Sequence, residues 1–79
     1  MSNKKLDLRQ IPANERHQKI HKKFEKLNSG ETLTIINDHE PKPLFYEMKA
    51  EIEKFDDKNY EVKKENKNKY IAKLPKKPK

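Results

Sequence analysis

Apolar residues recur along the chain in short stretches whose spacing predicts alternating strands and helices. Residues 6–9 alternate between apolar and polar side chains, which is typical of a half-buried strand. Residues 31–37 carry β-branched side chains at four of seven positions, the strongest strand signal in the chain. Residues 59–65 and 69–74 follow as two further strands, and the polar residues 66–68 between them predict a hairpin.

The first helix is expected to follow Asn14, whose side chain is a suitable N-cap. Ile20, Phe24 and Leu27 stand at i, i+4 and i+7 spacing and therefore fall on one helical face. Gly30 is expected to end this helix by adopting the left-handed backbone conformation that glycine tolerates.

The second helix is expected to begin at Pro43, because the first turn of a helix does not need the missing N–H of proline. Its apolar residues fall within about 100° of the helix circumference, and they are Leu44, Phe45, Met48, Ile52 and Phe55.

The predicted order of elements is β-α-β-α-β-β. Since each helix has one apolar face, both should pack on one face of a four-stranded mixed sheet, which makes the fold class α+β with a two-layer sandwich architecture. The strands at 6–9 and 31–37 are joined through a helix and should be parallel.

Composition places the chain near the border of disorder, but the apolar pattern favours a folded domain. Leu, Ile, Val and Phe supply only 16 of 79 residues, and charged residues make up 42%. Nearly all of these apolar residues fall on predicted core faces. A single domain is expected over residues 6–74, between a disordered basic N-terminus at 1–5 and a basic proline- and lysine-containing tail at 75–79.

The net charge of +7 is concentrated at the two ends of the chain. Five lysines in the terminal segments leave only +2 over the body. Solvated termini explain this pattern, and weak, non-specific nucleic-acid binding is the alternative. Only two basic residues are arginine, the side chain that binds guanine and phosphate bidentately, so sequence-specific nucleic-acid recognition is not indicated.

Several classes of site and location are excluded by composition. The absence of cysteine excludes disulfides, thiolate metal sites and thiol nucleophiles, and the single glycine excludes glycine-rich phosphate loops. The chain has no stretch of about 20 apolar residues, so no membrane span is predicted. The first thirty residues hold no apolar signal segment. A cytoplasmic location is therefore expected.

Six polar residues that are distant in sequence are expected to meet at one edge of the sheet. In parallel βα units, the carboxyl ends of strands and the amino ends of the following helices share one edge, where ligands bind. The six are Arg9 after the first strand, Glu15, Arg16 and His17 in the first helical turn, and Asp38 and His39 ahead of the second helix.

Three interpretations of this edge remain open. Neutral imidazoles with a carboxylate suit Zn, Fe or Cu, which makes His17, Asp38 and His39 candidate metal ligands. The amino ends of both helices, together with Arg9, suit an anion or another small ligand. In the third, structural interpretation, Asp38 and His39 cap the second helix and Glu15 pairs with Arg9.

His17 and His21 also stand at i, i+4, a spacing that can hold one ion on a single helix. The glutamate that follows the first histidine of an HExxH motif is absent, so the signal is weak. Two surface histidines on a lysine-rich helix are the simpler interpretation.

Ile36 and Ile71 are expected on the sheet face opposite the helices. An open, partly apolar sheet face can dock a protein partner, which is the alternative function. Catalysis is not expected, because so short a chain offers little wall to exclude water around a substrate. The oligomeric state is left open.

Conspicuous local motifs span residues 6–51. They are Leu6-Asp7-Leu8-Arg9, Pro12, Glu15-Arg16-His17, Gly30-Glu31-Thr32-Leu33, Asn37-Asp38-His39-Glu40-Pro41 and Pro43-Leu44. With these motifs the chain resembles a family of small prokaryotic domains of unknown function, the one numbered 2249. That family is similar to the TusA-type sulfur-transfer proteins, which implies the same two-layer β-α-β-α-β-β sandwich. Its members occur beside hemerythrin-like, cupin-like and iron–sulfur-assembly modules, which implies a redox or metal-handling context.

One departure from the sulfur carriers bears on mechanism. Those proteins hold a persulfide on a cysteine that precedes a proline just after the first strand. This chain has Gln10-Ile11-Pro12 there and no cysteine anywhere, so persulfide chemistry is excluded. The expectation is a non-enzymatic accessory domain that binds a metal ion or a small anionic ligand.

Overall fold

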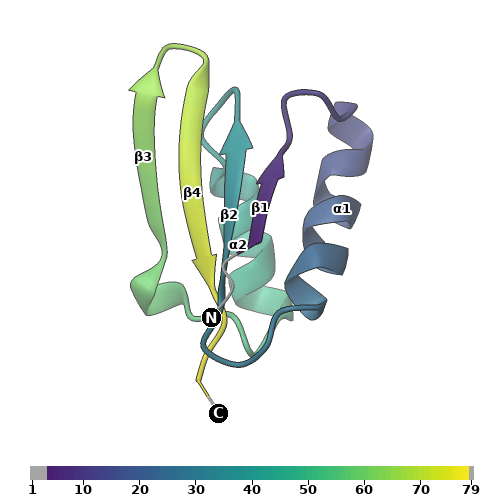
Figure 1. The fold of residues 1–79 in the computed structure, drawn as a ribbon, viewed down its shortest axis with the longest axis vertical. Helices are drawn as coiled ribbons and strands as arrows, with labels where there is room; N and C mark the ends of the chain where they lie inside the picture. Colours follow the sequence, from purple (N-terminus) through teal and green to yellow (C-terminus); the bar gives the residue numbers. More distant parts are fainter. Residues whose placement is uncertain (1–3, 79) are drawn as a thin grey trace.

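The computed structural model describes residues 4–78 as a four-stranded sheet with two helices on one face (Figure 1). The strands are β1 (Lys4–Asp7), β2 (Thr32–Asn37), β3 (Glu61–Asn66) and β4 (Lys69–Pro75), and the helices are α1 (Ala13–Glu25) and α2 (Lys42–Glu51). A short 3-10 helix, η1 (Asp57–Asn59), precedes β3. The predicted α+β class and β-α-β-α-β-β order are confirmed.

The strands lie in the order β1-β2-β4-β3. β1 and β2 are parallel, as the intervening helix predicted, whereas β4 is antiparallel to both β2 and β3. Along β2 the side chains of Leu33, Ile35 and Asn37 are buried, while the residues between them are half-buried. Ile35 stands opposite Leu6 on β1 and Ala72 on β4. The period of two therefore gives the sheet one face that belongs to the core.

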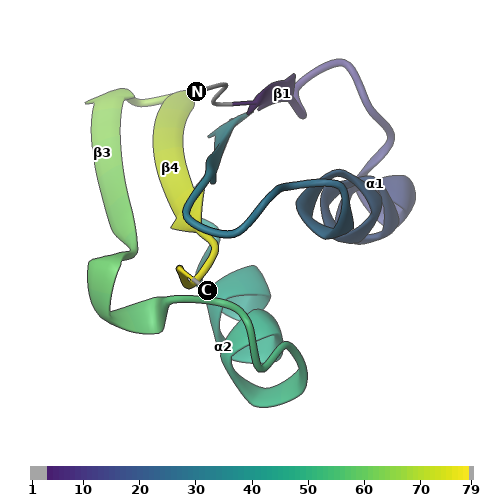
Figure 2. The same ribbon diagram turned by 60° about the horizontal axis from the view of Figure 1, so that its bottom comes forward.

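The core lies between this face and the two helices. α1 contributes Ile20 and Phe24, α2 contributes Leu44 and Met48, and each of these is at most 2% exposed. Among residues 4–78 the buried core residues are Leu8, Ile20, Phe24, Leu27, Leu33, Ile35, Leu44, Met48, Phe55, Ala72 and Leu74. Figure 2 shows both helices on the same side of the sheet, and β3, whose residues are all exposed, forms the edge farthest from α1.

α1 differs from its prediction at both ends. Its N-cap is Pro12 rather than Asn14, and no side chain caps it. The helix ends at Glu25, but the buried Leu27 amide still donates to the Phe24 carbonyl, so a tighter turn continues the apolar pattern. Gly30 does have a positive φ, 85°, but it lies in the turn before β2 rather than at the helix end.

α2 is shorter than the apolar spacing predicted. It ends at Glu51, and Ile52 is already extended. The Phe55 amide donates to the Ile52 carbonyl at 3.1 Å, and Phe55 forms an isolated bridge with Lys76. This turn places the Phe55 ring in the core. Phe55 is therefore buried, as its helical spacing predicted, although it lies outside the helix.

The expected terminal segments are wrong in part, because both contribute to the sheet. Lys4 and Lys5 belong to β1, and Pro75 is the last residue of β4. The Lys76 amide donates to the Glu31 carbonyl at 2.8 Å, which continues the contact between β2 and β4 beyond the ends of these strands. Residues 1–3 and 79 also belong to the predicted terminal segments, and they lie outside the described residues.

Candidate functional site

The carboxyl ends of β1 and β2 and the amino ends of both helices meet around one small cavity. Its volume is about 120 Å³. The lining residues are Leu8, Ala13, Arg16, His17, Ile20, Asn37, His39, Pro41, Pro43 and Leu44. Three of the six residues predicted for this edge, Arg16, His17 and His39, therefore line the same cavity.

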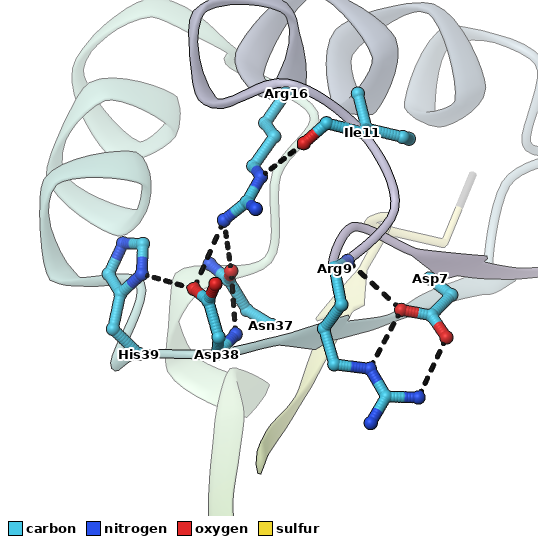
Figure 3. A network of polar contacts seen from close by, with 7 residues as sticks. All are labelled: Asp7, Arg9, Ile11, Arg16, Asn37, Asp38 and His39. Atoms are coloured by element: carbon cyan, nitrogen blue, oxygen red, sulfur yellow. Dashed lines mark hydrogen bonds and ion pairs between the residues drawn. The ribbon is translucent and has the colours of Figure 1, made fainter. Parts of the chain in front are cut away.

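Arg16 reaches from the first turn of α1 to the end of β2 (Figure 3). Its Nε donates to the Ile11 carbonyl at 2.9 Å, and its Nη1 donates to Asn37 Oδ1 at 2.9 Å and to Asp38 Oδ1 at 3.1 Å. The side chain is only 12% exposed. Three acceptors thus fix the guanidinium, which in turn satisfies the buried Asn37 amide oxygen.

Asp38 joins Arg16 to His39. Its Oδ1 also accepts from His39 Nδ1 at 2.7 Å, while its own amide donates to Asn37 Oδ1. The Arg16 bond, followed by the His39 bond, lowers the pKa of the Asp38 carboxyl below its ordinary value. Asp38 and His39 do not cap α2, because its N-cap is Pro41 and no side chain caps the helix. The structural interpretation of these two residues as caps is therefore wrong.

Arg9 lies apart from this cluster (Figure 3) and pairs with Asp7 rather than with Glu15. Its Nε and Nη2 bind the two carboxylate oxygens at 3.0 and 2.9 Å, and its amide donates to Oδ1 at 3.0 Å. These bonds lower the pKa of Asp7 to about 2. Glu15 is exposed in the first turn of α1.

His17 is paired with a residue that sequence reasoning missed, Glu47 on α2. His17 Nδ1 donates to Glu47 Oε2 at 2.9 Å, and His21 Nε2 donates to Oε1 at 3.0 Å. The His17 bond is the main cause that lowers the pKa of the Glu47 carboxyl. One carboxylate therefore bridges two imidazoles across the helices, so these histidines are not independent surface side chains.

The predicted metal ligands are divided between two carboxylates. His39 binds Asp38, whereas His17 binds Glu47. A different set has closely spaced donor atoms: one each from His21, Glu47 and Glu51 lie within 4.8 Å of one another. Glu47 and Glu51 repeat on α2 the i, i+4 spacing of the two histidines on α1, which was the available sequence signal.

Ile36 and Ile71 stand opposite each other on β2 and β4, on the sheet face away from the core. Both are half-buried rather than fully exposed. Lys63 on β3 is the next residue across the sheet from Ile71. An adjoining hollow of about 310 Å³ is lined by Glu61, Val62, Lys63, Ile71 and Lys73.

A family model described as uncharacterized conserved protein (DUF2249) matches residues 5–76. This range contains both the Arg16–Asp38–His39 cluster and the His17–His21–Glu47 contacts. No curated protein and no solved structure matches the chain, so a similarity to TusA-type proteins gains no support from these comparisons. No helix within residues 4–78 has the length and apolar character needed to cross a membrane.

Proposed function

The chain belongs to the DUF2249 family, and from this premise we propose that it is a binding domain for a small anion. The anion would occupy the cavity between the amino ends of α1 and α2. One observation carries the proposal: Arg16, His17 and His39 line a single cavity together with the first turns of both helices.

The charges around the cavity favour an anion over a cation. Each helix amino end carries about half a positive charge, and neither helix has a capping side chain that would satisfy its free N–H groups. Arg16 adds a full positive charge to the lining. Asp38, which partly balances that charge, is not among the lining residues. Anions bind favourably where helix amino ends and a guanidinium converge.

The size of the cavity favours a small ligand. Its volume of about 120 Å³ is below the roughly 300–1,000 Å³ of sites that hold drug-sized ligands. Leu8, Ile20 and Leu44 supply apolar walls beside the polar groups. A short carboxylate or a small oxyanion fits both the volume and this mixed lining.

A metal ion is the other ligand that the sequence leaves open for this edge. His17 and His39 bind different carboxylates through Nδ1, and neither belongs to the closely spaced donor set of His21, Glu47 and Glu51. We therefore place the anion first at this cavity. Zinc binding that is lost in His39→Gln and retained in His21→Gln would reverse that choice.

The proposal is tested by chemical-shift titration of the full chain with acetate, nitrite, sulfate and phosphate. Shifts at Arg16, His17 and His39 are expected, and Arg16→Gln should abolish them. Lys23→Gln removes the same charge from the exposed side of α1 and should change nothing. His39→Gln provides a second variant at an exposed residue, in case Arg16→Gln unfolds.

Two results would reject anion binding at this cavity. One is that no anion shifts the lining residues at millimolar concentration. The other is that Lys23→Gln weakens binding as much as Arg16→Gln, because the response would then report overall charge only.

Protein interaction through the open sheet face is the second candidate function. The adjacent Ile36 and Ile71 favour it, and Lys63 and Lys73 beside them suit an acidic partner. Ile71→Glu should abolish binding of a purified partner to the folded domain, whereas Arg16→Gln should not. If both variants bind equally, this face is not the interface.

A further inference from the structure

We propose that His21, Glu47 and Glu51 form a site for a divalent first-row transition-metal ion between α1 and α2, and that His17 positions Glu47. The site goes beyond the anion cavity, since of these four residues only His17 lines that cavity. It also differs from the ligand set His17, Asp38 and His39 that the sequence predicted.

The two helices present complementary pairs of ligand residues. His17 and His21 stand one turn apart on α1, and Glu47 and Glu51 stand one turn apart on α2. Residues at i and i+4 lie on the same side of a helix. The bonds from both imidazoles to Glu47 show that these two sides face each other. The four residues therefore form one contiguous group rather than two unrelated surface pairs.

The spacing of the donor atoms is close to what an ion requires. One ring nitrogen of His21 and one oxygen from each glutamate lie within 4.8 Å of one another. An ion with donors at about 2.0–2.2 Å holds neighbouring donors roughly 3–3.5 Å apart. The Glu51 side chain is exposed at the last residue of α2, so rotation about its side-chain bonds can close the remaining gap.

The donor chemistry defines the class of ion. One imidazole nitrogen with two carboxylate oxygens suits Zn²⁺, Fe²⁺ or Co²⁺, and the two carboxylates balance the charge of a divalent ion. His21 Nε2 and Glu47 Oε1 now share a proton at a distance of 3.0 Å. An ion bound at Nε2 would displace that proton, to solvent from a doubly protonated ring or to Nδ1 in a neutral one, so that the ligating ring carries its one proton on Nδ1.

His17 acts on the site through Glu47. Its Nδ1 donates to Oε2, which turns the other carboxylate oxygen, Oε1, toward His21. Hydrogen bonds of this kind fix the orientation of a metal ligand. The side chains of His21 and Glu47 are only 28% and 36% exposed, so they are held between the helices rather than free in solvent.

The test is a titration of the full, untagged chain with Zn²⁺ by calorimetry and with Co²⁺ by visible absorption. One ion per chain is expected, and His21→Gln and Glu51→Gln should each weaken binding by more than about 100-fold, the upper end of the range for a residue that only positions a ligand. Glu53→Gln removes a nearby exposed carboxylate and His39→Gln removes another imidazole, and neither should change affinity. Circular dichroism of each variant verifies the fold.

His17→Gln separates positioning from ligation. It should keep the stoichiometry of one ion and shift the Co²⁺ absorption bands, whereas His21→Gln should abolish them. The site is overturned if Zn²⁺ does not bind at micromolar concentration, if Glu51→Gln behaves like Glu53→Gln, or if His39→Gln weakens binding as much as His21→Gln. Arg16→Gln should leave Zn²⁺ binding intact, so failure of the anion proposal and failure of the metal site are distinguishable.

Discussion

Lys76 Nζ donates a 2.7 Å hydrogen bond to the carbonyl oxygen of Leu27, which joins the end of the chain to the end of α1. The same ammonium donates to the Glu25 carbonyl at 3.3 Å and lies 5.7 Å from the centre of the Phe24 ring. Carbonyls at a helix carboxyl end have no helical partner and carry partial negative charge. Lys76, which the sequence assigned to a tail, therefore closes α1.

Lys76→Met keeps the apolar stem of the side chain but removes the ammonium. We expect the free energy of unfolding to fall by about 1–2 kcal/mol, because a charged hydrogen bond and a favourable helix-end charge are lost. Lys77→Met, at an exposed side chain, should change it by less than about 0.5 kcal/mol. Urea denaturation followed by circular dichroism measures both. Equal effects would show that the ammonium contributes no specific stability.

The two arginines differ in the number of their acceptor residues and in their burial. Arg16→Lys should cost about 1–3 kcal/mol, because one ammonium cannot serve the acceptors on Ile11, Asn37 and Asp38, and the buried Asn37 Oδ1 then keeps only the Asp38 amide as a donor. Arg9→Lys should cost less than Arg16→Lys, because the Arg9 pair with Asp7 is exposed to solvent. Denaturation of both variants under the same conditions decides the order, and a larger cost at Arg9 would contradict it.

The Asp7 pair predicts a loss of stability in acid. Arg9 bonds lower the pKa of Asp7 from 3.8 to about 2 in the folded chain. Because the folded pKa lies below the unfolded one, the contribution is fully present above about pH 4 and is lost as the pH falls toward about 2. It should amount to less than about 1 kcal/mol, since the pair is solvent-exposed.

Asp7→Asn should remove this part of the acid dependence and leave the part that comes from Asp38 and Glu47, whose pKa values are also lowered. Carboxyl carbon shifts of Asp7 report its titration directly. Arg9→Gln should return the Asp7 pKa toward its ordinary value. An unchanged titration in that variant would mean that Arg9 is not the cause.

The alternation of apolar and polar residues predicted the strands, because burial of one sheet face requires this alternation within each strand. Leu33 and Ile35 alternate with half-buried residues, and this alternation is visible in the sequence. The ends of elements were harder to predict, because they depend on partners that are distant in the chain. The amide and the ammonium of Lys76 donate to the carbonyls of Glu31 and Leu27, which are distant in the chain. No local pattern therefore distinguishes Lys76 from a solvated lysine.

Topology alone predicted that Arg16 and Asp38 would meet, since it requires only that strand ends and helix starts share an edge. The partner of His17 could not be predicted in the same way. Glu47 lies in the middle of α2, and its contact with His17 depends on how the two helices pack on the sheet. A glutamate on a lysine-rich chain resembles a solvated charge until that packing is known.

Phe55 presents the sharpest difference between pattern and structure, and Glu53→Pro tests it. The Phe55 amide bonds the Ile52 carbonyl, which makes residues 52–55 a turn with Glu53 at its second position. Proline is favoured at that position, and Ile52 already has the extended backbone that a following proline requires. We expect the free energy of unfolding to change by less than about 1 kcal/mol. A helix continuing through Phe55 would instead lose about 3 kcal/mol, the loss expected for Ala50→Pro inside α2. Equal destabilisation by the two prolines in urea denaturation would show that α2 extends to Phe55.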